Sequence, residues 1–230
     1  MKNKKFVLLG TLLLMTLITG SALAHGVDEN TKAFLAGNSG AAFIPFLYIG
    51  AKHMLTGYDH LLFLVGVIFF LYKPKEVVLY VSFFTLGHSL TLLFGVLAHV
   101  SINSYLIDAI IALSIVYKGF DNLGGFKQMF GVQPNTKGAV LIFGLFHGFG
   151  LASKLQDLGA GTDGIVTNLI GFNLGVEIGQ CIALVFVLIL ISTWRRSTSF
   201  IRFSTYTNAF LIAAGFILMG YQLTGYLLIN

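Results

Sequence analysis

Histidine and carboxylate side chains stand inside apolar stretches of this sequence, where ionisable groups are rare. The densest of these segments runs from His53 to His60 and carries Asp59 beside the second histidine. A charged residue in a membrane-spanning helix costs roughly 2.5 to 3.5 kcal/mol, so such residues usually face a bundle interior and serve function. Imidazole nitrogens beside a carboxylate are typical ligands of transition metals. The segment therefore predicts a metal site.

The spacing within this segment suggests how the ligands are oriented. His53 and His60 are seven residues apart, which brings them to nearly the same helical face after two turns. Both are expected to look into one interior. Asp59 points about 100° away from His60 on a helix, so we expect it to orient an imidazole on a neighbouring helix, as carboxylates near metals often do.

Two further histidines stand in apolar segments next to glycine. His88 follows Gly87, and His147 precedes Gly148. Glycine lets a second helix approach closely. A lone buried histidine is more often a hydrogen-bonded structural residue, but the presence of a histidine pair elsewhere favours both as ligands.

Polar residues also mark the third and fifth apolar segments. Asn173, Glu177 and Gln180 are four and then three residues apart, which forms one polar stripe on a helix. Glu177, the one carboxylate in that segment, is predicted as a ligand, with helix-to-helix hydrogen bonding as the alternative. Asn173, Gln180 and Asp108 are predicted as supporting polar groups. For Asp108, helix capping is the alternative.

The composition requires membrane helices to position these residues. Of 230 residues, 56% are hydrophobic and 10% are charged, whereas soluble domains have about 25% charged residues. We predict an all-α membrane protein, a single domain over residues 25–230 with a bundle of about six transmembrane helices. The expected spans are residues 41–72, 76–98, 104–120, 138–156, 165–193 and 206–228.

Two of the expected segments have internal features. The first is too long for one span and is interrupted around residues 52–59, so it is interpreted as a short outer helix followed by the true span. The segment 122–137 contains Gly124, Gly125, Gly131 and Pro134, and is interpreted as a linker between two three-helix halves.

Residues 1–24 have the pattern of a signal peptide. Lysines precede an apolar stretch that ends in Ala22-Leu23-Ala24. Cleavage there would make His25 the first residue, whose amine and imidazole could chelate Cu(II) or Ni(II). The alternatives are that His25 merely follows the cleavage site, or that the segment is retained as a seventh span and no chelate forms.

The charge distribution indicates an orientation. The net charge is +5, and with the mature N-terminus outside, eight basic residues fall in inner loops and three outside. This agrees with the positive-inside rule and predicts an inner-membrane, multi-pass protein with both mature termini extracytoplasmic. The charge gives no indication of nucleic-acid binding. In this orientation all the candidate ligands lie in the outer half of the membrane.

The ligand types restrict the metal and leave three functions open. Cys181 is the only cysteine, so CxxC metal sites are excluded. Imidazole and carboxylate suit divalent Ni, Cu, Co or Zn. The chain has no Walker motif, so it does not hydrolyse ATP itself. The preferred function is a metal-ion permease. The alternatives are a membrane-embedded metalloenzyme with Zn, Fe or Cu, and a binding protein or sensor without flux.

The sequence resembles the HupE/UreJ family of membrane proteins, regarded as nickel or cobalt permeases and associated with hydrogenase and urease accessory functions. The His-x5-Asp-His pattern is matched by His53, Asp59 and His60, and a Phe-His-Gly element by residues 146–148. Residues 84–89 and 172–177 are similar to the second branch of the family. Lys154 stands where the nickel-permease pattern has Glu. The resemblance implies metal transport, with metalloenzyme maturation proteins as candidate partners.

Overall fold

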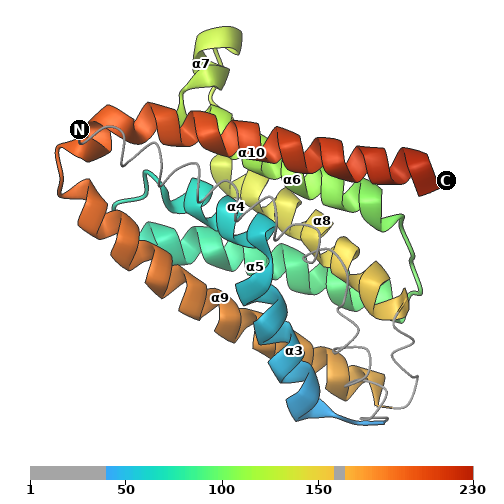
Figure 1. The fold of residues 1–230 in the computed structure, drawn as a ribbon. Coiled ribbons are helices and arrows are strands. Elements are labelled where there is room, and N and C mark those ends of the chain that lie inside the picture. The colour runs from blue at the N-terminus through green and yellow to red at the C-terminus, as the bar shows by residue number, and fades with distance from the viewer. Residues whose placement is uncertain (1–39, 158–163, 230) are drawn as a thin grey trace, which may run out of the picture.

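The computed structural model describes residues 40–157 and 164–229, and within these ranges the chain is helical, without strands. This confirms the all-α class. The helices are α3 (Phe43–Thr56), α4 (Tyr58–Ile68), α5 (Pro74–Leu97), α6 (Ser104–Asn122), α7 (Gly125–Phe130), α8 (Thr136–Asp157), α9 (Ile165–Arg195) and α10 (Ser199–Ile229), arranged as one bundle (Figure 1). The predicted signal peptide and His25 lie outside the described residues.

Four of the described helices, α5, α8, α9 and α10, are long and apolar enough to cross a membrane. The chain is therefore a multi-pass membrane protein. Helices α4 and α6 do not meet this description of a membrane-spanning helix. Helix α6 carries Asp108, Lys118 and Asp121, and α4 is apolar but has only 11 residues. The expected count of six spans stays a prediction.

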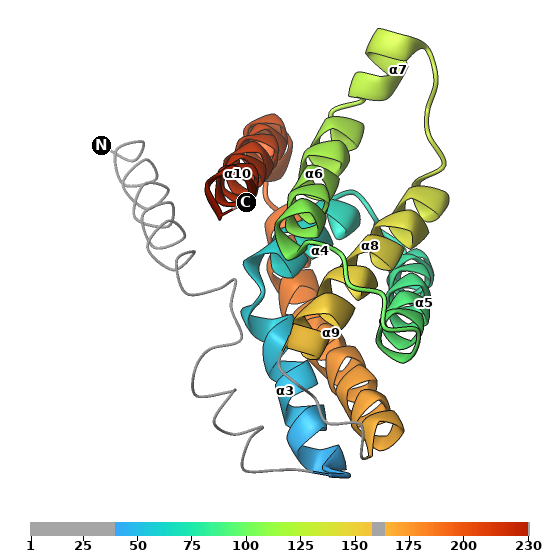
Figure 2. The same ribbon diagram turned by 90° about the vertical axis from the view of Figure 1, so that its right-hand side faces the viewer.

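The helices associate in three pairs: α3 with α9, α5 with α8, and α6 with α10. Each pair joins a helix that precedes the 122–137 segment to one that follows it. The two halves of the sequence therefore interlock in one bundle. The 122–137 segment contains the short helix α7, which projects away from the other helices (Figure 2).

Glycines allow two of these pairs to pack backbone against backbone. Along α9, Gly171, Gly175 and Gly179 lie against α3, and a side-chain carbon at Gly175 would overlap the Leu47 carbonyl group. On α8, Gly148 lies equally close to the backbone of α5 at His88. Such contacts between small residues are a main source of helix association in membranes. They fix where the candidate ligands of α5 and α8 stand.

Helices α3 and α4 form one interrupted element, and they point in different directions (Figure 1). The interruption is at Gly57, whose backbone is extended, with φ −73° and ψ 103°. Its amide donates to the His53 carbonyl at 3.0 Å. A Cβ at this position would lie 2.7 Å from His60 Nδ1. A glycine is therefore required where the candidate ligands meet.

The two ends of the bundle are called the α3 end and the α7 end. Helices α3 and α9 begin, and α5 and α8 end, at the α3 end, whereas α7, Lys73 and Arg195 lie at the α7 end. Helix α10 starts at Ser199, whereas the expected span starts at residue 206. The difference arises because the polar residues between them are also helical.

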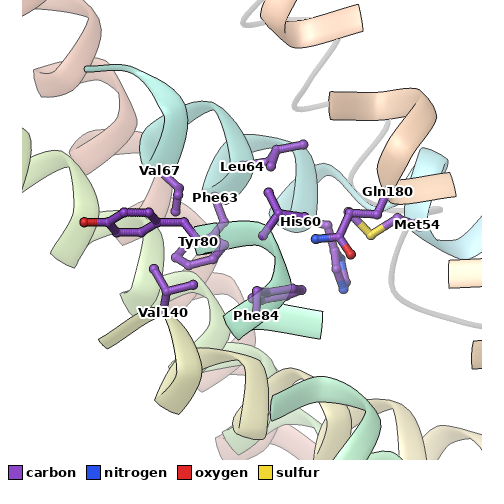
Figure 3. Close-up of a pocket in the computed structure, with 10 residues that line it drawn as sticks. Met54, His60, Phe63, Leu64, Val67, Tyr80, Phe84, Val140 and Gln180 are labelled. Carbon is purple, nitrogen blue, oxygen red and sulfur yellow. The ribbon is translucent and has the colours of Figure 1, made fainter. Parts of the chain in front are cut away.

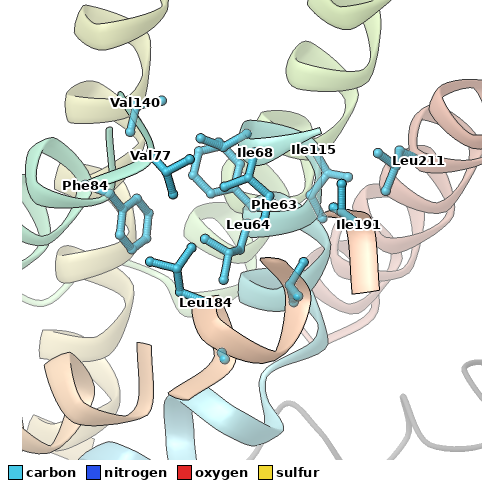
Figure 4. Packing of buried hydrophobic residues seen from close by; sticks show 13 residues of the cluster. Phe63, Leu64, Ile68, Val77, Phe84, Ile115, Val140, Leu184, Ile191 and Leu211 are labelled. Carbon is cyan, nitrogen blue, oxygen red and sulfur yellow. The ribbon is translucent and has the colours of Figure 1, made fainter. Parts of the chain in front are cut away.

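Two apolar clusters fill the interior. One lies toward the α7 end and includes Phe63, Leu64, Phe84 and Val140 (Figure 4). The other lies toward the α3 end and includes Phe46, Leu92 and Phe172. The candidate histidines stand where the two clusters meet, since Phe84 contacts His147 and Phe172 contacts His53.

Candidate metal centre

Asp59 orients the neighbouring His60, at the first turn of α4. Its Oδ1 accepts hydrogen bonds from the His60 amide at 2.9 Å and from His60 Nδ1 at 2.8 Å. We expected Asp59 to serve an imidazole on another helix. That expectation was wrong, because Asp59 stands beside Gly57, where the first turn of a helix leaves amides to bind. Because Nδ1 is bound to Asp59, Nε2 is the ring nitrogen of His60 available to a further partner.

His147 on α8 is fixed in the same way by its own helix. Its Nδ1 donates to the Phe143 carbonyl at 2.7 Å, and its Nε2 has no hydrogen-bond partner among the described residues. The side chain is buried, and its ring lies edge-on to that of His60, with 4.9 Å between ring centroids. Two imidazoles from different helices therefore meet, each held by a hydrogen bond at Nδ1.

His53 on α3 completes a group of three rings. Its centroid lies 5.0 Å from that of His60, again edge-on. The expected same-face geometry of His53 and His60 on one helix is wrong, because the helix is broken at Gly57. The break folds the two histidines toward each other instead. His53, His60 and His147 are called the histidine cluster below.

The ring spacing in the histidine cluster is close to that around a metal ion. With metal–nitrogen bonds of about 2.0 to 2.1 Å, two imidazoles on one tetrahedral ion have centroids roughly 5 Å apart. In the described part of the chain, however, no three His, Cys, Asp or Glu side chains converge as ligands. Rotation of the rings from their edge-on contacts would be needed to direct their nitrogens at one point.

His88 on α5 is the most deeply buried of the four described candidate histidines, with 1% of its surface exposed. Neither of its ring nitrogens has a hydrogen-bond partner within the described residues. It lies within electrostatic range of all three members of the histidine cluster. Leaving a buried polar group unpaired costs about 1 to 3 kcal/mol, so His88 reduces the stability of the fold unless another group binds its nitrogens.

A narrow cavity extends from the histidine cluster toward the α7 end. His60, Gln180 and Met54 lie at one end and Tyr80 at the other (Figure 3). Between them the lining is apolar, from Phe63, Val67, Phe84 and others. The space open to water is about 10 Å³, which is room for about one molecule. Met54 was not predicted, although its thioether adds a soft donor beside His60.

The predicted polar stripe of α9 is divided between two environments. Asn173 accepts a hydrogen bond from Ser89 at 3.2 Å, and Gln180 accepts one from Thr85 at 2.8 Å. Both therefore join α9 to α5 as supporting groups. Glu177 is exposed on the outer surface of α9, and no hydrogen bond or ion pair joins it to the described residues. The structure does not bring Glu177 to the histidine cluster.

Asp108 forms a buried ion pair that sequence reasoning missed. Lys154 Nζ donates to both carboxylate oxygens of Asp108, at 3.0 and 2.8 Å. The side chains are 5% and 21% exposed. The ion pair, and not helix capping, accounts for Asp108. The two residues are 46 positions apart, so only the packing of α6 on α8 brings them together, and no local pattern in the sequence signals the contact.

Comparison with known proteins gives one match. A family model described as HupE / UreJ protein matches residues 29–230. The chain belongs to the HupE/UreJ family. This family is linked to transport or uptake of nickel and cobalt. No curated protein and no solved structure matches the chain. In this HupE/UreJ chain, Lys154 forms the ion pair with Asp108 described above.

A second set of polar groups, with the buried Lys118, Asp121 and Asn208 among them, lies at the α7 end of this HupE/UreJ chain. Lys118 donates to Asp121 at 2.5 Å, and Asp121 also accepts from Gln133. Asn122 donates to Asn208 and to the Gly66 carbonyl, each at 2.8 Å. These groups are called the α7-end network below. All of its members have partners.

Proposed function

We propose that this HupE/UreJ protein is a membrane permease for a divalent transition-metal ion, with His53, His60, His88 and His147 as its ligands. The carrying observation is that the His60 ring lies about 5 Å from the rings of both His53 and His147, and the three histidines come from three separate helices. Buried histidines without a shared role are not expected to lie in contact with one another. Asp59 serves as the group that orients His60.

The donor set supports a borderline metal. Neutral imidazole nitrogens suit Ni, Co, Cu and Zn, whereas Mg and Ca require mostly oxygen ligands. Met54 beside His60 adds a soft donor and favours Cu or Zn within this group. The metal is cargo in this proposal. We do not place Glu177 among the ligands, because its side chain is exposed away from the histidine cluster.

The direction of access follows from charge. We infer that the α3 end faces outward and the α7 end faces the cytoplasm, because Lys73, Arg195 and Arg196 gather at the α7 end. An ion captured from outside would meet the histidines first. It would then have to pass the apolar lining of the cavity, including Phe63 and Phe84, so inward release requires the surrounding helices to separate.

The test uses purified protein in detergent and in proteoliposomes. Titration with Ni²⁺, Co²⁺, Cu²⁺ and Zn²⁺ should give about one ion per chain, and a gradient of that ion should drive uptake. His60→Ala should abolish both. His99→Asn is the matched control, because His99 is exposed at the α3 end and asparagine tolerates its φ of 52°. Unchanged uptake in His60→Ala would overturn the proposal.

A membrane metalloenzyme is the second candidate, favoured by the apolar lining of the cavity, which offers no further charged ligands toward the α7 end. In that case the same histidines would hold a resident ion with one open position. The distinguishing result is metal that copurifies with the protein, resists chelation and shows no flux. Sequencing of the mature N-terminus tests the separate proposal that His25 is exposed as an outer chelating group.

A further inference from the structure

A fixed positive charge stands next to the proposed metal ligands. Lys154 is seven residues after His147 on α8, which places both on nearly the same face of that helix. Side chains on a helix tilt toward its N-terminus. The Lys154 side chain therefore extends from the α3 end back toward the histidine cluster.

The electrostatic interactions of Lys154 agree with this placement. The Lys154 ammonium interacts with His53, Asp59 and His147. A dication bound among those side chains would be repelled by the ammonium, and in a buried site of low effective dielectric such repulsion is not screened by water. An unopposed lysine here would weaken metal binding strongly.

Asp108 opposes that charge. Its two oxygens hold the ammonium at 3.0 and 2.8 Å from the side of α6. The carboxylate is 5% exposed, so its negative charge acts with little screening. The two charges nearly cancel at a distance, but at close range it is the Lys154 charge that acts on His53 and His147.

We propose that Lys154, held by Asp108, sets the affinity of the metal site and keeps it weak enough to release its ion. This inference rests on the proposed function. A permease must bind its metal ion and also release it. Four imidazoles with an orienting carboxylate would bind the ion so tightly that release would be slow. The nearby ammonium lowers that affinity without occupying a ligand position, and Asp108 limits how far.

The experiment is a double-mutant cycle measured with Ni²⁺ on the full chain. Lys154→Met should tighten binding about tenfold, lower the KM for uptake and lower the maximal uptake rate, because release slows. Asp108→Asn should weaken binding about tenfold. The Asp108→Asn/Lys154→Met double variant removes both charges and should return to within about threefold of the wild type. Lys137→Met, an exposed lysine on the same helix, is the control for net charge and should change nothing.

The signs of these effects separate this proposal from a merely structural ion pair. A structural pair would give weaker binding in both single variants, and that result would overturn the inference. If a single variant does not fold, the double variant still tests it, since it leaves no buried charge unpaired: binding more than about tenfold weaker than in the wild type would count against the proposal. Equal affinities in all variants overturn this inference alone, whereas a wild-type protein that binds no Ni²⁺, Co²⁺, Cu²⁺ or Zn²⁺ overturns the proposed function with it.

Discussion

The histidine cluster and the α7-end network are both buried and polar, but they differ in how their hydrogen-bonding groups are used. At the α7 end, Lys118, Asp121 and Asn122 all have partners within the described chain. Around the histidine cluster, His147 keeps one ring nitrogen unpaired and His88 keeps both. A buried polar group without a partner reduces stability. The difference supports the proposal that the histidines bind a ligand, whereas the α7-end network stabilises the fold.

This contrast also explains why charged residues alone do not identify the site. Lys118 and Asp121 are buried, like His60, His88 and His147. Their charges neutralise each other, because the two residues form an ion pair within one helix. The informative property is therefore the remaining bonding capacity of a buried group. The predictions below test whether the two regions can be altered independently.

The largest effect is expected at the α7 end. Lys118→Met leaves Asp121 without its cation, and breaking a buried ion pair in this way should destabilise the protein by about 3 to 5 kcal/mol. Ni²⁺ affinity should stay within about twofold of the wild type in the folded fraction, because the network does not touch the histidines. Unfolding in denaturant and calorimetric titration provide the two measurements. A large change in affinity would mean that the two regions are coupled.

Asp59→Asn should produce the opposite pattern. The amide is neutral, so it removes the negative charge that raises the basicity of His60 and it fixes the tautomer less firmly. Ni²⁺ affinity should therefore fall about 10- to 100-fold. Global stability should change little. Calorimetry on the variant and the wild type measures this, and His99→Asn again serves as the control. An unchanged affinity would show that the Asp59 contact has no part in metal binding.

His88→Leu should separate stability from binding most clearly. Leucine fills a similar space without unpaired nitrogens, so the metal-free protein should gain about 1 to 3 kcal/mol. At the same time Ni²⁺ affinity should fall severalfold. Thermal unfolding with and without Ni²⁺ tests both. If the variant is less stable than the wild type without metal, then His88 is a structural residue and does not belong with the ligands.

The sequence was most informative where candidate ligands and a helix interruption lie in the same segment. The His-x5-Asp-His segment identified His53 and His60, and the polar residues around 52–59 indicated an interruption that occurs at Gly57. Apolar runs predicted the all-helical membrane class. These properties depend on neighbours in the chain, and the sequence displays them directly.

Contacts between distant segments could not be obtained in this way. The Asp108 to Lys154 pair depends on how α6 meets α8, and the meeting of His147 with His60 depends on glycine contacts between helices. Glu177 is close to Asn173 and Gln180 on the helical wheel. It is rotated by about 40° around α9 from Asn173, however, and this rotation leaves it exposed. The sequence pattern cannot resolve such an angle until the neighbouring helices are known.

The interrupted helix gives the histidines an electric field that no titration can remove. Helix α3 ends at Thr56, so its C-terminal carbonyl groups point toward the region where His53 and His60 meet. A helix C-terminus carries the equivalent of about half a negative charge. The positive N-terminus of α4 begins at the same place, but Asp59 in its first turn compensates for it. A cation arriving there is therefore attracted by the C-terminus of α3 together with the Asp59 carboxylate.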